Sequence, residues 1–402
     1  MKATETPLSV NERSLQRRAE SKPTFFYRPE LDVLRFLAFL AVFCCHSLQV
    51  GGQHPIFLAQ SPIWRLYRTT LEAGNFGVCI FFLLSSYLIT SLLHIERVKT
   101  GNIRLGSFYM RRILRIWPLY LSVIAFFVIC GHFLPTLHIE PGQALAYVFV
   151  VGNWYLVAHP LAKFQLNWLW SISVEEQFYL AWPLIAKIGG MRLVSVLSIL
   201  LVPISVLVVA TMTENGQNLH GQVWLNSLVQ FQFFALGALL ALYLGAKERS
   251  FHRFSRLTMA FLGTACWLTA SGVCRIKSPE VDPSVLAMCI GYELVALGTV
   301  LIFLSFLGVP SRYLPRFIIY LGKISYGLYV FHEIALSCTT AVRRLVESEL
   351  SGSSILWAAS VLLDRAGALA LTITLAALSY RYLESPFLRM KQRFTLVRSR
   401  TG

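Results

Sequence analysis

Charged residues are scarce in this sequence, and their scarcity excludes most soluble folds. Only 14% of the 402 residues are Asp, Glu, Lys or Arg, whereas 55% are hydrophobic. A soluble globular domain carries roughly 25% charged residues. The mean hydropathy of +0.59 instead indicates an all-α polytopic membrane protein, whose first partner is the lipid bilayer.

Cysteines at metal-binding or redox spacing are also lacking. The eight cysteines include no CxxC pair, and most lie within apolar runs. We therefore expect small buried hydrophobic side chains rather than a disulfide framework or a metal site. The dipeptide His332–Glu333 does not belong to an HExxH zinc motif, because position 336 is leucine. The sequence thus predicts no metal.

Acidic residues are few relative to basic ones, 20 against 36, which gives a net charge of +16. The basic residues gather in short segments between apolar runs, as the positive-inside rule of membrane proteins requires. No basic stretch is interleaved with surface aromatic residues in a soluble context, so nucleic acid is not an expected partner. A basic membrane face suits anionic lipids and also a cytosolic substrate that carries phosphates.

Ten apolar runs are long enough to cross a bilayer, at about 20 residues per span. They cover residues 31–50, 74–96, 113–133, 168–187, 191–211, 224–245, 257–275, 286–309, 317–341 and 356–382. A further run at 144–157 is short for a span. If it crossed, the later basic loops would lie outside, against the positive-inside rule. The predicted fold is a bundle of about ten transmembrane helices, with both termini cytoplasmic and a non-spanning segment near 144–157.

The chain is expected to contain one membrane domain with a short extension at each end. A basic cytoplasmic arm covers residues 1–27, the transmembrane domain covers 28–390, and a basic cytoplasmic tail covers 391–402. No internal repeat or long linker indicates a second domain.

Two ionisable residues stand out in the first apolar run. Arg35 and His46 stand eleven positions apart in DVLRFLAFLAVFCCH, roughly three turns or ~16 Å along a helix. Ionisable groups inside a membrane are expensive and are therefore functional candidates. A neutral imidazole can accept a proton near neutral pH, which makes His46 a candidate general base. The alternative is a histidine that bonds a backbone carbonyl in helix packing.

An arginine cluster stands at the start of the run 113–133. Arg111, Arg112 and Arg115 occur in FYMRRILRIWPLY, at the expected inner membrane surface, and the last two share one helix face. Guanidinium groups bind phosphates bidentately. The cluster is therefore a candidate phosphate site, and positive-inside anchoring is the alternative.

Two adjacent carboxylates, Glu175 and Glu176, occur in WSISVEEQFYL. They point about 100° apart on a helix, so at most one faces a given site. Carboxylates at this depth are costly without partners, which favours a catalytic role: one of them would orient His46 or pair with Arg35.

Four further side chains are expected to support the substrate or the structure of the site. They are Ser85 in GVCIFFLLSSYLI, Trp170 beside the two glutamates, and Tyr326 and His332 in ISYGLYVFH. For Ser85 the alternative is simple helix packing, and for Trp170 it is an interfacial aromatic belt.

In this order, the stretches resemble the acyltransferase-3 family of integral-membrane acyltransferases. The resemblance runs from about residue 28 to 390, and it also includes YRYLESPF near the end of the chain. One departure is Ser86, where the family motif has glycine. The resemblance implies that the motif histidine of the family falls on His46, and its motif arginines on Arg35, Arg112 and Arg115.

The resemblance also implies a function, O-acyl transfer from a cytosolic acyl-CoA, expected to be acetyl-CoA. The acceptor would be a hydroxyl of a glycan or another cell-envelope molecule. Arg35, Arg111, Arg112 and Arg115 would bind the donor, and His46 would remove the acceptor proton or, alternatively, carry the acyl group itself. The expected location is a bacterial cytoplasmic membrane. A transporter or flippase of a glycan or small anion is the alternative from another class, although the sequence shows no inverted repeat.

Overall fold

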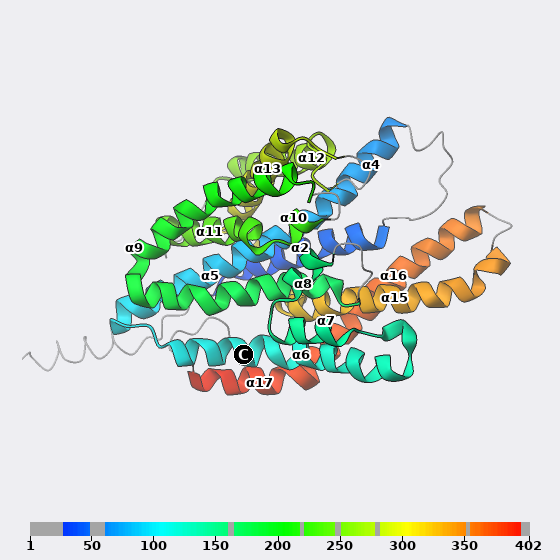
Figure 1. Ribbon diagram of the computed structural model, residues 1–402, viewed down its shortest axis with the longest axis horizontal. Coiled ribbons are helices and arrows are strands. Elements are labelled where there is room, and N and C mark those ends of the chain that lie inside the picture. Colours follow the sequence, from blue (N-terminus) through cyan, green and yellow to red (C-terminus); the bar gives the residue numbers. More distant parts are fainter. Residues whose placement is uncertain are drawn as a thin grey trace, which may run out of the picture.

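The computed structural model describes residues 27–48, 61–159, 165–217, 221–245, 251–277, 282–350 and 354–394. Residues 1–26 of the predicted arm 1–27 and residues 395–402 of the predicted tail 391–402 lie outside the described residues. Within the described ranges, all regular secondary structure is helical (Figure 1), which confirms the predicted all-α class.

Nine long helices form the described part of the bundle. They are α2 (Pro29–Leu48), α5 (Gly77–Thr100), α6 (Leu105–Phe133), α9 (Trp170–Glu214), α11 (Ser227–Leu244), α12 (Arg253–Gly272), α13 (Val285–Phe306), α15 (Ser325–Leu350) and α16 (Ser354–Ser379). Shorter helices connect or flank them, namely α4 (Pro62–Ala73), α7 (Pro141–Val148), α8 (Gly152–Ala158), α10 (Gln222–Leu225), α14 (Arg316–Lys323) and α17 (Ser385–Lys391). The predicted apolar runs fall largely on these helices.

Seven helical stretches among the described residues are long and apolar enough to cross a membrane. They are Pro29–Leu48, Pro62–Thr100, Leu105–Phe133, Asn167–Glu214, Ser227–Leu244, Val285–Phe306 and Ala359–Phe394. The predicted spans 257–275 and 317–341 lie on α12 and α14–α15, which are not among the seven. The chain is therefore a multi-pass integral membrane protein, while the count of ten spans and the sidedness of its ends remain predictions.

The helix α9 bends sharply at Gly190 and turns back along the bundle (Figure 1), so that it accommodates two of the predicted runs. Gly190 has φ 68° and ψ −168°, a conformation that is essentially restricted to glycine. Beside the bend, Arg97 Nη1 donates a hydrogen bond of 2.6 Å to the Ala186 carbonyl. That bond satisfies one of the acceptors that the end of the first half of α9 leaves open.

The segment near 144–157 is divided between two short helices, α7 and α8. They are eight and seven residues long, and at 1.5 Å per residue each extends only ~12 Å, well short of a ~30 Å hydrocarbon core. Gln177 of α9 donates hydrogen bonds of 2.8 Å to the Val150 carbonyl and to Asn153 Oδ1, so protein covers the irregular backbone between them. The segment is therefore not one continuous spanning helix.

The helix α5 lies at the centre of the bundle, in contact with α2, α9, α11 and α13. Its contact with α11 depends on Gly237, because a Cβ there would lie 2.3 Å from the Leu83 carbonyl oxygen and 3.1 Å from Ser86 Cβ. A glycine on the partner helix thus makes room for Ser86. The close approach fixes α5, which carries Phe81 and Ser85 into the middle of the protein.

Candidate active site

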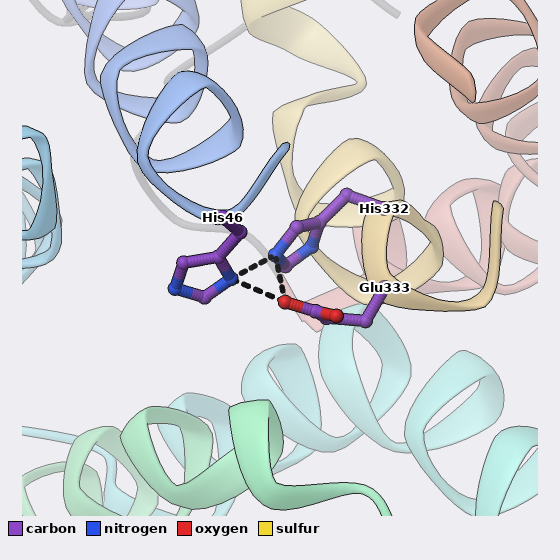
Figure 2. Close-up of side chains that lie close together, drawn as sticks. All are labelled: His46, His332 and Glu333. Atoms are coloured by element: carbon purple, nitrogen blue, oxygen red, sulfur yellow. Dashed lines mark hydrogen bonds and ion pairs between the residues drawn. The ribbon is translucent and has the colours of Figure 1, made fainter. Parts of the chain in front are cut away.

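Figure 2 shows three side chains that meet between α2 and α15: His46, His332 and Glu333. His46 Nδ1 contacts the Glu333 carboxylate directly and lies 3.1 Å from His332 Nε2. The other ring nitrogen of His332, Nδ1, lies 2.6 Å from the Tyr329 carbonyl oxygen. His332 is fully buried, whereas the side chains of His46 and Glu333 are each 27% exposed. The cluster thus has one member that is closed off from solvent and two that are partly accessible to it.

These contacts assign the protons on both imidazole rings. A backbone carbonyl only accepts, so His332 Nδ1 carries the proton, and Nε2 of the neutral ring is an acceptor. The donor between the rings is therefore His46 Nδ1–H, which His332 and Glu333 share. His46 Nε2 keeps its lone pair and is the atom that can take up a proton. The Glu333 carboxylate would then stabilise the imidazolium that forms.

Glu333 is the carboxylate that contacts His46, in place of the expected Glu175 or Glu176. Glu175 accepts hydrogen bonds from Ser85 and Tyr179, and Glu176 accepts one of 2.9 Å from Trp117 Nε1. The expectation that one of this pair orients His46 therefore does not match the geometry. The physical reason is that their part of α9 turns these carboxylates toward α5 and α6, not toward the end of α2. The signal for Glu333 was present in the sequence, since it is an acid beside a histidine in an apolar run.

A pocket of about 1450 Å³, its open mouth included, lies among α2, α5, α6, α9 and α15. Basic side chains that line it come from the beginnings of α2 and α6 and from the end of α17, namely Arg28, Arg35, Arg111, Arg112, Arg115 and Lys391. Ser85 and Glu175 line its middle, and Phe81, Ser171 and Tyr329 line it toward the histidine cluster. The pocket therefore joins the predicted arginine site to the neighbourhood of His46.

The arginines of the pocket differ in how they are held. Arg111 Nη1 donates a hydrogen bond of 2.7 Å to the Phe394 carbonyl, and Nη2 lies 3.3 Å from the Glu96 carboxylate. Arg112 instead lies over the ring of Tyr179, 5.1 Å from its centroid, and its buried Nε has no hydrogen-bond partner among the described residues. Arg111 is thus committed to holding two segments together, and Arg112 is better placed to receive an anion.

The remaining predicted residues divide between pocket and core. Arg35 lines the pocket and forms an ion pair of 2.7 Å with Asp32. Tyr326 also lines it and donates a hydrogen bond of 2.8 Å to the Ile116 carbonyl. Trp170 is buried and packs on Phe82, with ring centroids 6.1 Å apart. Trp170 therefore supports the wall of the site and does not line the pocket.

His46, His332 and Glu333 are also the one group of metal-ligand type in the described part of the chain, with ligand atoms within 4.8 Å of one another. Two imidazoles and a carboxylate suit Zn²⁺. An ion here would have to replace both contacts of His46 Nδ1, because each ligand atom already engages another member of the group. The expectation of no metal remains a prediction, which metal analysis of the purified protein tests.

Comparison with known proteins identifies a family whose sequence pattern this chain matches. The acyltransferase-3 family model, described as an acyltransferase domain, matches residues 28–381. The peptidoglycan O-acetyltransferase OatA of Listeria monocytogenes is 26% identical over 392 residues, which cover 90% of this chain and 56% of OatA. YrhL of Bacillus subtilis, named provisionally for the same activity, is 28% identical over 387 residues, which cover 90% of this chain and 55% of YrhL. The chain thus spans about half the length of these curated relatives. No solved structure matches significantly.

Proposed function

The chain belongs to the acyltransferase-3 family, and from this membership we propose that it moves an acetyl group from acetyl-CoA to a hydroxyl of a cell-envelope glycan. The observation that carries the proposal is the pairing of a basic pocket with a histidine whose Nε2 is available as a base. The pocket suits a donor with phosphates at one end, and the histidine suits the activation of a hydroxyl.

In this proposal the pocket holds the donor. Arg112, with Arg35 and Arg115 beside it, binds the phosphates of acetyl-CoA. The pantetheine arm runs along α5 past the hydrogen-bonded pair Ser85–Glu175, and the thioester then lies at the Phe81 end. Glu175 lines the pocket and accepts hydrogen bonds from the amide groups of the arm. Glu176 is buried behind the lining and fixes the wall through its hydrogen bond from Trp117.

His46 carries out the proton transfer. Its Nε2 takes the proton of the acceptor hydroxyl while the hydroxyl oxygen attacks the thioester carbonyl. The C–S bond breaks, and the CoA thiolate leaves with the proton that His46 returns. General-base assistance of this kind supplies about 10²–10⁴-fold in rate. Glu333 balances the positive charge that forms on the ring, and an acyl group held transiently on His46 Nε2 is the alternative route.

The acceptor approaches from outside the pocket. Part of the His46 side chain is exposed, yet the pocket lining does not include it among the described residues. With both termini cytoplasmic, the arginines face the cytosol and His46 lies toward the outer side of a bacterial inner membrane. The name of the relative OatA specifies peptidoglycan, so a sugar hydroxyl of a peptidoglycan-type glycan is the proposed acceptor.

A thiol-release assay tests the proposal. Detergent-purified protein should release CoA thiol from acetyl-CoA when a glycan acceptor is present, and mass spectrometry should find the acetyl group on the glycan. His46→Ala should abolish both signals, whereas His132→Ala, at an exposed histidine, should retain them. Glycan movement across vesicles without thiol release would instead establish the transporter alternative.

A further inference from the structure

The pocket ends at a thin wall in front of the histidine cluster. Phe81 and Tyr329 line the pocket, whereas His46 and His332 do not belong to the lining that the structure describes. The rings of Phe81 and Tyr329 meet edge to face with centroids 6.1 Å apart. The Tyr329 ring also lies 5.4 Å from the ring of His332. A donor in the pocket therefore meets this aromatic pair before it can reach the base.

Tyr329 is the fixed half of the wall. Its hydroxyl donates a hydrogen bond of 2.8 Å to the Trp168 carbonyl and lies 2.7 Å from Ser171 Oγ. Its own carbonyl accepts the hydrogen bond from His332 Nδ1. Any movement of Tyr329 would break these bonds and would disturb the orientation of His332.

Phe81 is the half that can move. Its ring has no hydrogen-bonding group, it is only half-buried, and it lies one helical turn before Ser85, on the face of α5 that borders the pocket. It also packs at the junction of two hydrophobic clusters, one centred on α5 and the other on Phe39 and Phe43 of α2. A change of its rotamer opens the wall without the loss of a polar contact.

We propose that Phe81 determines which acyl groups the protein transfers, because its ring closes the donor pocket and leaves space in front of His332 for a short acyl chain only. The inference rests on the proposed donor site. The acetyl methyl group fits beside the ring, whereas each further methylene must displace it. The same closure keeps the thioester away from water until an acceptor is in place.

The test compares acyl-CoA donors of increasing chain length. In Phe81→Ala, the ratio of kcat/KM for butyryl-CoA to kcat/KM for acetyl-CoA should rise about tenfold or more, in the range that a few methylenes contribute in an apolar pocket. Thiol release without acceptor should rise as well. Leu88→Ala is the matched control, since Leu88 lines the same pocket two turns farther along α5 and should leave the ratio unchanged.

The outcomes separate the inference from the function on which it rests. An unchanged ratio in an active Phe81→Ala protein overturns the role of Phe81 and leaves the acetyl transfer intact. Absence of thiol release from the wild-type protein overturns the proposed function itself. If Phe81→Ala does not accumulate, Phe81→Leu and Phe81→Trp apply the same criterion, with an increased ratio for leucine and a decreased ratio for tryptophan.

Discussion

His46 of α2 and Glu333 of α15 meet through a direct contact between the imidazole Nδ1 and the carboxylate. The contact fixes the tautomer of His46, because the carboxylate holds the proton on Nδ1 and leaves Nε2 open. It also places a negative charge next to the ring that becomes positive in the proposed reaction. The two residues thus form a unit whose parts can be separated by mutation.

Replacement of the Glu333 carboxylate should slow the reaction without weakening the binding of acetyl-CoA. In Glu333→Gln, the amide can present an N–H to His46 Nδ1, which favours the wrong tautomer and removes the stabilising charge. We expect kcat to fall about 10²-fold or more, within the scale of general-base contributions, with KM for acetyl-CoA near its wild-type value. Steady-state kinetics measure both constants. A raised KM at unchanged kcat would contradict the role of Glu333 beside the base and would show that it helps to bind the donor.

The arginines of α6 should separate into a binding residue and a structural one. Arg112→Ala should weaken acetyl-CoA binding roughly 10–100-fold, the equivalent of a lost charge-assisted hydrogen bond. Arg111→Ala should chiefly lower the melting temperature, because it leaves Glu96 and the Phe394 carbonyl without their cation. Calorimetric titration and thermal melts in detergent measure the two effects. Equal loss of affinity in both variants would show that Arg111 also binds the donor.

The bend in α9 should depend on glycine. Gly190→Ala places a Cβ at φ 68°, 3.0 Å from the Arg97 guanidinium, and should destabilise the protein by about 1–3 kcal/mol, the usual cost of such a conformation. Gly106→Ala is the control, since a Cβ at that position would meet no neighbouring side chain or helix within 4 Å. Melting temperatures of the two variants in one detergent give the comparison. A pair of equal melting temperatures would mean that the bend tolerates a side chain.

Lys277, in the loop after α12, should make the stability of the folded protein depend on pH. Burial lowers the pKa of Lys277 to about 8, whereas an unfolded lysine has a pKa of about 10.4. Below about pH 8 the folded state therefore bears the full cost of a partly buried ammonium, and that cost disappears as the pH rises toward 10. The melting temperature should rise over this interval, and Lys277→Met should flatten the rise. If the melting temperature rises equally with pH in both proteins, the rise is due to groups other than Lys277.

The sequence predicts the helices far better than it predicts their partners. Apolar runs locate α2, α5 and α6 because a bilayer demands long uninterrupted stretches, and the glycine at position 190 lies in the gap between two predicted runs. His46 and Arg112 stood out because ionisable groups in such runs are costly. Glu333 is an ionisable residue of the same kind, but its pairing with His46 could not be predicted, because no local pattern encodes the packing of α15 against α2.

The same limit explains the other differences. Arg111 and Arg112 are neighbours of identical type in the sequence, and only the folded chain brings Glu96 and Phe394 to one of them. Phe81 lies in an apolar run among other large hydrophobic residues, so nothing in the sequence distinguishes it. Tertiary contacts decide which members of a motif bind, which hold the fold together and which close a pocket.

The partial exposure of His46 outside the pocket has a kinetic consequence. If donor and acceptor reach the histidine from opposite sides of the wall, neither has to leave before the other arrives. Direct transfer then proceeds through a ternary complex, and double-reciprocal plots at several fixed acceptor concentrations should intersect rather than run parallel. A wall one aromatic pair thick would thus determine the order of events as well as the choice of acyl group.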